Sequence, residues 1–411
     1  MAVTQGADTL LHLLLALATI IVGVRLCGAA FRRLGQPPVV GELIGGILLG
    51  PSLLGRLAPE LSATLLPASV KPMLSVLGSL GVVLYMFLVG LELDLRDLRR
   101  LGRTTFVVAI AGIAVPFVLG TGIAAGLYDS YAPPGTPYPV FALFVGVSLS
   151  VTAFPVLARI LSDRGMTKTP LGTMALSAAA VEDAMAWCLL AVVVGIAQSA
   201  ARSAVVTILL TVLFVAFVFV VLRPVARWVL ERFDRDEPSP ASVLSVVIAA
   251  LLASAAATEV IGVHAVFGAF LFGAVVPSHL RISSDLRHRL EGVVFALFLP
   301  VFFATIGMSI DLLAIGSPAS WLVLGVILLA ACAGKLGGTL AAGRVMGLPW
   351  RDATALGVLM NTRGLVELIV LDIGLGLGIL SFELFTMLVV TALVTTFMTS
   401  PLLDLLQRVR H

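Results

Sequence analysis

The chain alternates long apolar segments with short polar connections from Leu10 to its C-terminal end. A helix that crosses a membrane needs about 20 mostly apolar residues. Cutting the sequence at charge clusters and at Pro and Gly breaks gives about thirteen such segments, namely 9–31, 38–55, 71–91, 104–127, 139–161, 171–199, 203–222, 241–258, 261–278, 292–310, 318–343, 352–373 and 382–406. The pattern predicts an all-α polytopic membrane protein without a soluble domain.

Composition supports this interpretation. Of the 411 residues, 59% are apolar and only 12% are charged, whereas soluble domains carry roughly 25% charged residues. The residues before the first apolar run include no Lys or Arg, so we expect the first helix to stay in the mature protein. The five histidines do not cluster, and there is no nucleotide-binding loop, zinc signature or nucleophile elbow. We therefore expect no enzymatic activity, cofactor, resident metal or nucleic-acid partner.

The basic residues predict the orientation of the chain in the membrane. Every second connection is rich in Lys and Arg, whereas the intervening connections hold only Arg56, Lys71 and Arg202. Cytoplasmic loops carry an excess of basic residues. We expect an odd number of spans in the cell membrane, with the N-terminus outside and the C-terminus in the cytoplasm.

Three pairs of segments resemble each other across the two halves of the chain. The pairs are 41–51 with 268–277, 86–95 with 303–312, and 151–155 with 361–365. They keep the same order in both halves, and each partner lies an odd number of segments further along. This arrangement predicts an inverted-topology repeat, which is common in secondary transporters.

The third pair interrupts two apolar segments with polar or helix-breaking residues. These residues are Ser148, Ser150, Thr152 and Pro155 in one segment, and Asn361, Thr362, Arg363 and Gly364 in the other. Broken helices at corresponding positions of two repeats point to a binding site near the membrane midplane. We expect the two breaks to cross there, bringing together helix ends whose partial charges need compensation.

Two adjacent acids, Glu182 and Asp183, lie in the middle of an apolar segment. Ionisable residues at this depth cost at least ~2.5–3.5 kcal/mol, so those that remain are presumed functional or paired. A carboxylate can hold either a proton or a monovalent cation, and the two compete for one charge. We assign the main site to Asp183, with Thr152 beside it. Neighbouring helical residues point about 100° apart, so sequence leaves open whether Glu182 joins this site or forms a structural ion pair.

Other charged residues within the apolar segments are candidates for charge compensation. Lys335, flanked by Gly334, Gly337 and Gly338, is the expected partner of the acidic site, Asp183 in particular. Arg363 and Glu367 are four residues apart and can form an ion pair on one helix face. Glu42 is also within an apolar segment, with Arg363 as a possible partner. Arg25 can snorkel to the interface, and we assign it no function.

Three motifs resemble the second family of monovalent cation–proton antiporters, which includes Kef potassium efflux systems, NapA-type sodium antiporters and plant cation exchangers. The motifs are Gly-Glu-Leu-Ile-Gly-Gly from Gly41, Leu-Pro-Val-Phe-Phe-Ala-Thr-Ile-Gly from Leu299, and Asn-Thr-Arg-Gly-Leu-Val-Glu-Leu from Asn361. The resemblance implies an NhaA-like fold of thirteen helices with two crossed broken helices, acting by elevator-like alternating access. In this family the essential aspartate corresponds to Asp183 and the intramembrane lysine to Lys335.

The resemblance also implies a homodimer with two parts. We expect a dimerisation and scaffold part near 1–60 and 203–280, and an ion-transport part near 71–199 and 292–406. This chain carries Glu182 where relatives carry Asp, Asn or Gln. A second acid is associated in the family with electrogenic exchange, so Glu182 favours it. Kef-like proteins also have a cytosolic sensing domain, which we do not expect within these residues. Either a separate cytosolic regulator acts on the protein or the domain has been removed.

The expected function is therefore exchange of Na⁺ or K⁺ for H⁺ across a lipid bilayer. Two alternatives use similar features. A gated monovalent cation channel also tolerates buried acids and broken helices, although it needs no titrating carboxylate. A sodium-coupled solute symporter can share the architecture, although Lys335 argues against it.

Overall fold

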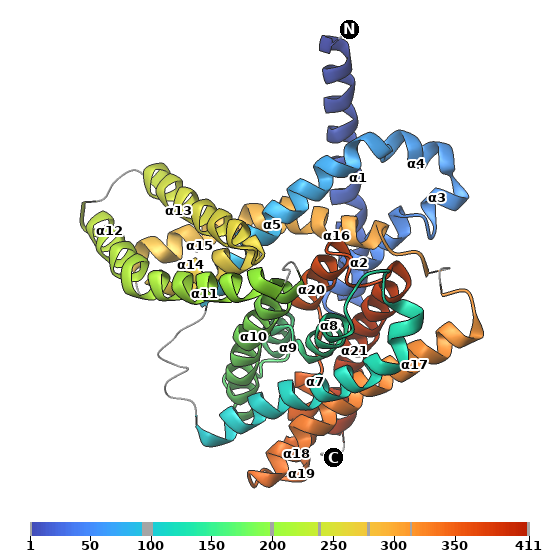
Figure 1. Ribbon diagram of the computed structural model, residues 1–411, viewed down its shortest axis with the longest axis vertical. Coiled ribbons are helices and arrows are strands. Elements are labelled where there is room, and N and C mark those ends of the chain that lie inside the picture. The colour runs from blue at the N-terminus through green and yellow to red at the C-terminus, as the bar shows by residue number, and fades with distance from the viewer. Residues whose placement is uncertain are drawn as a thin grey trace. The chain divides into compact units, whose positions relative to one another are not determined.

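The computed structural model describes residues 2–92, 102–197, 201–236, 240–277, 280–312 and 315–408. Within these residues the secondary structure is entirely helical (Figure 1). The end of the repeated segment 86–95 lies outside them. The elements of the first half are α1 (Ala2–Arg33), α2 (Pro38–Leu49), α3 (Leu54–Leu57), α4 (Pro59–Leu65), η1 (Ala68–Val70), α5 (Lys71–Glu92), α7 (Arg103–Tyr131), α8 (Tyr138–Ser150), α9 (Phe154–Asp163) and α10 (Pro170–Ala197).

The described part of the second half is also helical. Its elements are α11 (Ala201–Phe217), η2 (Val218–Leu222), α12 (Arg223–Asp236), α13 (Pro240–Ile261), α14 (Ala265–Val275), α15 (Arg281–Val293), η3 (Val294–Phe298), α16 (Leu299–Met308), α17 (Pro318–Cys332), η5 (Ala333–Gly337), α18 (Gly338–Val345), α19 (Trp350–Met360), α20 (Leu365–Gly376) and α21 (Phe382–Arg408). Of the short elements, η2, η3 and η5 are π-helical turns inside longer helices.

The helices confirm a polytopic membrane protein. Ten helices of the described chain are long and apolar enough to cross a membrane. The bent pair α19 and α20, which meet at 43°, makes an eleventh span. The apolar helices α8 and α14 are shorter. Each of the thirteen segments expected from sequence overlaps one of these helices or the bent pair.

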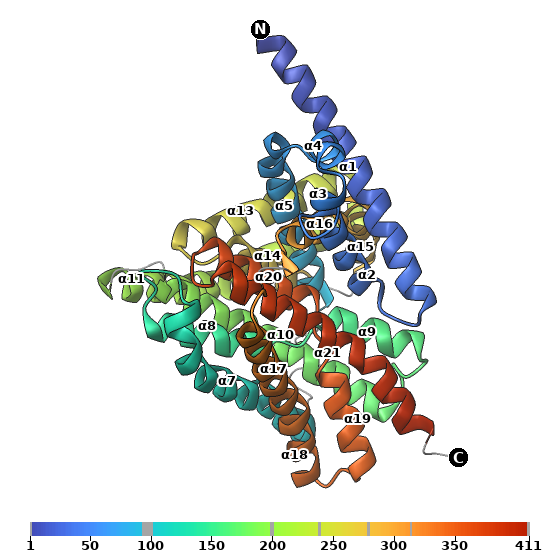
Figure 2. The ribbon, with the colours of Figure 1, turned by 90° about the vertical axis from the view of Figure 1, so that its right-hand side faces the viewer.

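The chain divides into two compact units. One unit consists of Met1–Leu17, Ala68–Asp97 and Ala191–Phe302, and the other of Ala18–Pro67, Leu98–Leu190 and Phe303–His411. In the first unit, α14 packs between α5 and α13. In the second, α7 packs along α8 and against the continuous rod of α17, η5 and α18 (Figure 2). All residues of the candidate site belong to the second unit.

Close glycine contacts reveal the inverted repeat. In the second unit, Gly46 of α2 lies against α16, where a Cβ added to it would come 2.6 Å from the carbonyl oxygen of Phe303 and close to Gly307. In the first unit, Gly273 of α14 lies in the same way against Gly90 of α5. Gly46 corresponds to Gly273 in the sequence repeat, and Gly90 corresponds to Gly307. The repeat therefore generates the same helix contact twice, with the partners exchanged.

A second contact also occurs twice, this time between neighbouring helices within each half of the chain. A Cβ on Gly41 of α2 would lie 2.6 Å from the carbonyl oxygen of Cys27 in α1. A Cβ on Gly268 of α14 would collide with the carbonyl oxygen of Ser254 in α13. The spacing between Gly41 and Gly268 equals that between Cys27 and Ser254. Small residues let membrane helices approach closely, and here they do so at equivalent points of both repeats.

Candidate functional site

The two interrupted segments touch at their interruptions. Residues 151–153 separate α8 from α9, and residues 361–364 separate α19 from α20. The backbone N–H of Ala153 donates to the carbonyl of Thr362 at 3.1 Å. The hydroxyl of Thr152 lies 3.2 Å from the carbonyl of Met360, at the C-terminal end of α19. Non-helical backbone at membrane depth must be satisfied by protein or water, and these two breaks satisfy each other.

The first break has a local cause. Pro155 lies in the first turn of α9, where its missing N–H costs no helical hydrogen bond. Proline disfavours a helical conformation in the residue before it and cannot donate to the preceding turn. Ser150, the last residue of α8, directs its hydroxyl to the carbonyl of Gly146, at 2.7 Å, and toward the carbonyl of Ile113 in α7. The helix end is thereby fixed to α7.

A buried ion pair lies beside this crossing. The ammonium of Lys335 is 2.6 Å from Oε2 of Glu182 and 2.5 Å from the hydroxyl of Thr152. Thr152 Oγ1 is 2.5 Å from the same carboxylate oxygen. All three side chains are fully buried. Lys335 lies in η5, Glu182 in α10 and Thr152 in the first break. The contacts among these three side chains therefore connect three parts of the fold.

The local backbone directs Lys335 into this position. It lies in the π-helical turn η5, which continues α17 into α18. A π turn often marks a functional site because it adds a residue to the turn and changes which side chains face a neighbour. Gly334 and Gly338 bring this turn against α7, at Pro116 and Val115 respectively. Gly337 has open space where a Cβ would be, so only two of the three glycines support the close approach expected from sequence.

Asp183 follows Glu182 on α10 and is only 3% exposed. It interacts electrostatically with Lys335, although the ion pair itself is formed by Glu182. We expected Lys335 to face Asp183. The difference follows from helix geometry, because consecutive residues point about 100° apart and only one of them can face η5 squarely.

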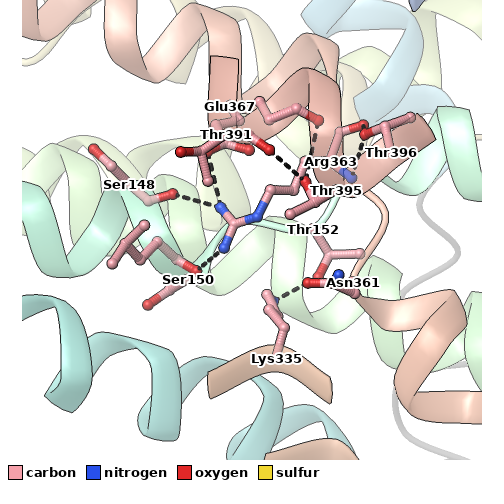
Figure 3. Close-up of polar contacts among 12 residues, drawn as sticks. Ser148, Ser150, Thr152, Lys335, Asn361, Arg363, Glu367, Thr391, Thr395 and Thr396 are labelled. Atoms are coloured by element: carbon pink, nitrogen blue, oxygen red, sulfur yellow. Dashed lines mark hydrogen bonds and ion pairs between the residues drawn. The ribbon is translucent and has the colours of Figure 1, made fainter. Parts of the chain in front are cut away.

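Arg363 compensates the partial negative charge at the C-terminal end of α8, where the two breaks cross (Figure 3). Its guanidinium donates to the carbonyls of Ser148, at 3.1 Å, and Leu149, at 2.6 Å, in the last turn of α8. The C-terminal end of a helix carries partial negative charge and unpaired carbonyls. Glu367, one turn into α20, lies 2.8 Å from Arg363 as the expected i,i+4 pair. Both side chains are fully buried.

Threonines of α21 support the second break, and they were not among the residues predicted from sequence. The hydroxyl of Thr396 accepts from the backbone N–H of Arg363 at 3.0 Å and donates to its carbonyl at 2.6 Å. Thr362 lies 3.4 Å from the hydroxyl of Thr399. Thr391, Thr395 and Thr399 recur every four residues and are buried. This spacing of hydroxyls on one face of an apolar helix was a signal available in the sequence.

The remaining predicted residues lie further from the ion pair or make other contacts. Glu42 pairs with Arg25 of α1 at 2.9 Å, and not with Arg363. The cause is that α1 and α2 pack closely through Gly41, while Arg363 is already engaged with α8. Asn361, at the end of α19, is 2% exposed and directs its amide nitrogen toward the sulfur of Cys332, 3.8 Å away. Gly364 is the residue directly before α20.

The side chains of this site are mainly oxygen-bearing. Within the described residues, no three His, Cys, Asp or Glu side chains come together in a way that could hold a metal ion. The site instead combines two adjacent carboxylates, one ammonium and a threonine hydroxyl. Hard oxygen ligands of this kind suit alkali cations.

Residues 17–405 match a known protein family, which is described as "Sodium/hydrogen exchanger, transmembrane". The chain belongs to the sodium/hydrogen exchanger family. The resemblance deduced from the three sequence motifs is thereby confirmed. Relatives similar in sequence to this exchanger-family chain are antiporters. The chain is therefore a transport protein.

Relatives of this exchanger-family chain include both short and long proteins. It is 42% identical over 400 residues to "Na(+)/H(+) antiporter NhaS4" of Synechocystis sp., covering 97% of this chain and 98% of that protein. It is 41% identical to "Cation/H(+) antiporter 20" of Arabidopsis thaliana, covering 95% of this chain and 48% of that protein. It is 38% identical to "K(+)/H(+) antiporter 1" of Saccharomyces cerevisiae, covering 91% and 44%. The chain thus spans about half the length of the plant and yeast relatives.

The fold also matches a solved structure. The sodium proton antiporter MjNhaP1 from Methanocaldococcus jannaschii superposes with a TM-score of 0.67 at 15% identity, covering 95% of this chain and 94% of that one. This likeness shows the fold and confirms the NhaA-like architecture expected from sequence.

Proposed function

We propose that this protein is a secondary antiporter that exchanges Na⁺ or K⁺ for H⁺, with the proton and the cation competing for Asp183. The observation that supports this most is the buried ion pair of Lys335 and Glu182 at the contact between two broken helices. Asp183 adjoins the pair on α10 and is almost fully buried.

Charge accounting explains why such a site would exchange one ion for another. Glu182, Asp183 and Lys335 carry a net charge of −1 when all three are ionised. Either one monovalent cation or one proton at Asp183 brings the cluster to neutrality. Binding both would leave an excess charge in a low-dielectric environment, which is costly. Competition for one negative charge therefore couples the two fluxes one for one. Such exchange moves no net charge, unlike the electrogenic exchange that a second acid favours in the family.

Glu182 and Thr152 have separate roles in this proposal. Glu182 pairs with Lys335, and Asp183, which also interacts electrostatically with Lys335, takes the proton or the cation. Thr152 offers a hydroxyl oxygen beside the carboxylate of Glu182, and its position depends on the contact between the breaks. Arg363 keeps the end of α8 neutral during transport, since its charge is already matched by Glu367 and two carbonyls.

The surrounding assembly is proposed on the basis of the family and the sequence. We propose a homodimer in the plasma membrane, with the N-terminus outside and the C-terminus in the cytoplasm, as the distribution of basic residues predicts. Residues near 1–60 and 203–280 would form the scaffold part, and those near 71–199 and 292–406 the transport part. Access would alternate between the two membrane faces.

Purified protein in proteoliposomes tests the function directly. A gradient of Na⁺, K⁺ or Li⁺ is imposed, and proton movement is followed with the membrane potential held at zero by ionophores. Exchange predicts proton movement driven by Na⁺ or K⁺ at zero potential. Cation current without coupled proton movement would instead identify a channel and overturn the proposal.

A further inference from the structure

Gly112 of α7 lies directly against the carboxylate of Glu182. A Cβ added at this glycine would collide with Oε1 of Glu182 and would lie only 3.0 Å from its Cδ. No other side chain or backbone atom is among the three nearest atoms that such a Cβ would meet. Gly112 therefore leaves a notch in α7 that the end of the Glu182 side chain fills.

The carboxylate cannot leave this notch freely. Its Oε2 is held at 2.6 Å by Lys335 and at 2.5 Å by Thr152. Moving the group away from α7 would break one or both of these contacts, at a depth where lost partners of a buried charge are costly. The usual flexibility of a glutamate is thus unavailable to relieve a clash at position 112.

We propose that Gly112 is a positioning residue that makes room for a glutamate at position 182 and so aligns its carboxylate with Lys335 and Thr152. The notch matches side-chain length. An aspartate at 182 is one methylene shorter and would withdraw from α7, whereas a glutamate needs the space that a Cβ would occupy. The residue at 112 thereby determines which acid at 182 can pair with Lys335. The effect on transport rests on the function proposed above, while the steric relationship does not.

Helix propensity distinguishes a steric contact between Gly112 and Glu182 from the general effect of replacing a glycine in a helix. Alanine favours a helix interior over glycine, so Gly112→Ala would stabilise α7 locally if the notch had no function. Gly122 of the same helix provides a matched control, because a Cβ added there meets nothing within 4 Å. An effect seen at 112 and not at 122 therefore reports on Glu182.

The test compares Gly112→Ala, Gly122→Ala, Glu182→Asp and the double variant Gly112→Ala/Glu182→Asp in proteoliposomes. Overpacking a buried contact predicts an exchange rate lowered about tenfold in Gly112→Ala, with a displaced pH profile. Gly122→Ala should stay within about twofold of wild type, as expected for a site without steric contact. The double variant should recover the rate and pH profile of Glu182→Asp alone, since the shorter acid removes the clash.

Thermal unfolding of the same four variants in detergent gives a readout that does not depend on transport. Gly112→Ala should lower the Tm, and Glu182→Asp should reverse that loss. If wild type shows no exchange but this reversal occurs, the notch stands and the proposed function fails. A Gly112→Ala variant with wild-type Tm, rate and pH profile would overturn the inference. So would a double variant that falls as far below Glu182→Asp as Gly112→Ala falls below wild type.

Discussion

The ammonium of Lys335 lies 2.6 Å from the carboxylate of Glu182, and neither side chain is exposed. Asp183, the next residue on α10, lies outside this ion pair. The structure thus gives Glu182 and Asp183 different contacts, whereas the sequence alone left open whether both belong to one ion site. Glu182 pairs with the lysine, and in the function proposed above Asp183 takes the transported ion.

Removing one partner of the pair should destabilise the protein. Lys335→Gln leaves the carboxylate of Glu182 buried without its cation, and such a change costs about 3–5 kcal/mol of unfolding free energy. The double variant Lys335→Gln/Glu182→Gln should recover most of this loss, because no unpaired charge remains. Thermal unfolding in detergent measures both. Lys168→Gln, at an exposed position, is the control. Equal stability of Lys335→Gln and wild type would contradict a buried ion pair.

Arg363 should be replaceable only by a group that reaches both carbonyls of α8. Arg363→Lys keeps the charge but presents a single ammonium without the fork geometry of a guanidinium. We expect it to retain part of the stability and to lose exchange activity. Arg363→Gln should lower the unfolding free energy by about 3 kcal/mol or more, since Glu367 would be buried without its partner. An Arg363→Gln variant as stable as wild type would show that the cap on α8 is dispensable.

Thr396 should matter more than its neighbour Thr395. The Thr396 hydroxyl bonds the N–H and C=O of Arg363, whereas the Thr395 hydroxyl bonds only carbonyls of its own helix. Thr396→Val leaves a buried N–H without a partner and should cost about 1–3 kcal/mol. The isosteric Thr395→Val should cost less. Unfolding temperatures of the two purified variants give the comparison, and the reverse order would argue against a supporting role for Thr396.

The glycine contacts of the inverted repeat should tolerate no added methyl group. A Cβ on Gly307 would lie 2.5 Å from the backbone of Gly46, whereas one on Gly325 meets open space. Gly307→Ala should therefore lower the unfolding free energy by about 1–3 kcal/mol, as overpacking does. Gly325→Ala should be neutral or slightly stabilising in the same thermal assay. Similar Tm values for both variants would contradict the close packing of α2 on α16.

The parts of the fold that local chemistry determines were predictable. Runs of apolar residues specify the spans, and Pro155 and the polar stretch from Asn361 specify the breaks, since each acts on its own stretch of backbone. The repeat was visible because close helix packing restricts Gly46, Gly90, Gly273 and Gly307 to the smallest residue.

The partners of the buried charges were harder to predict. Which acid meets Lys335 depends on the rotation of α10 and on the π-helical turn around the lysine, and neither is written in residue spacing. Glu42 pairs with Arg25 because α1 and α2 pack closely against each other. The sequence had suggested Arg363 as its partner. Gly112 resembles any other glycine of an apolar helix until the carboxylate beside it is seen.

In the proposed function the proton and the cation share Asp183. Proteoliposomes containing wild type, Asp183→Asn and Asp183→Glu are tested for Na⁺- or K⁺-driven proton movement at zero membrane potential, after equal Tm values confirm folding. Asn keeps the size of the side chain but is uncharged and does not titrate, so we expect Asp183→Asn to abolish exchange while Asp183→Glu retains a measurable part. Exchange in Asp183→Asn at the wild-type rate would contradict it.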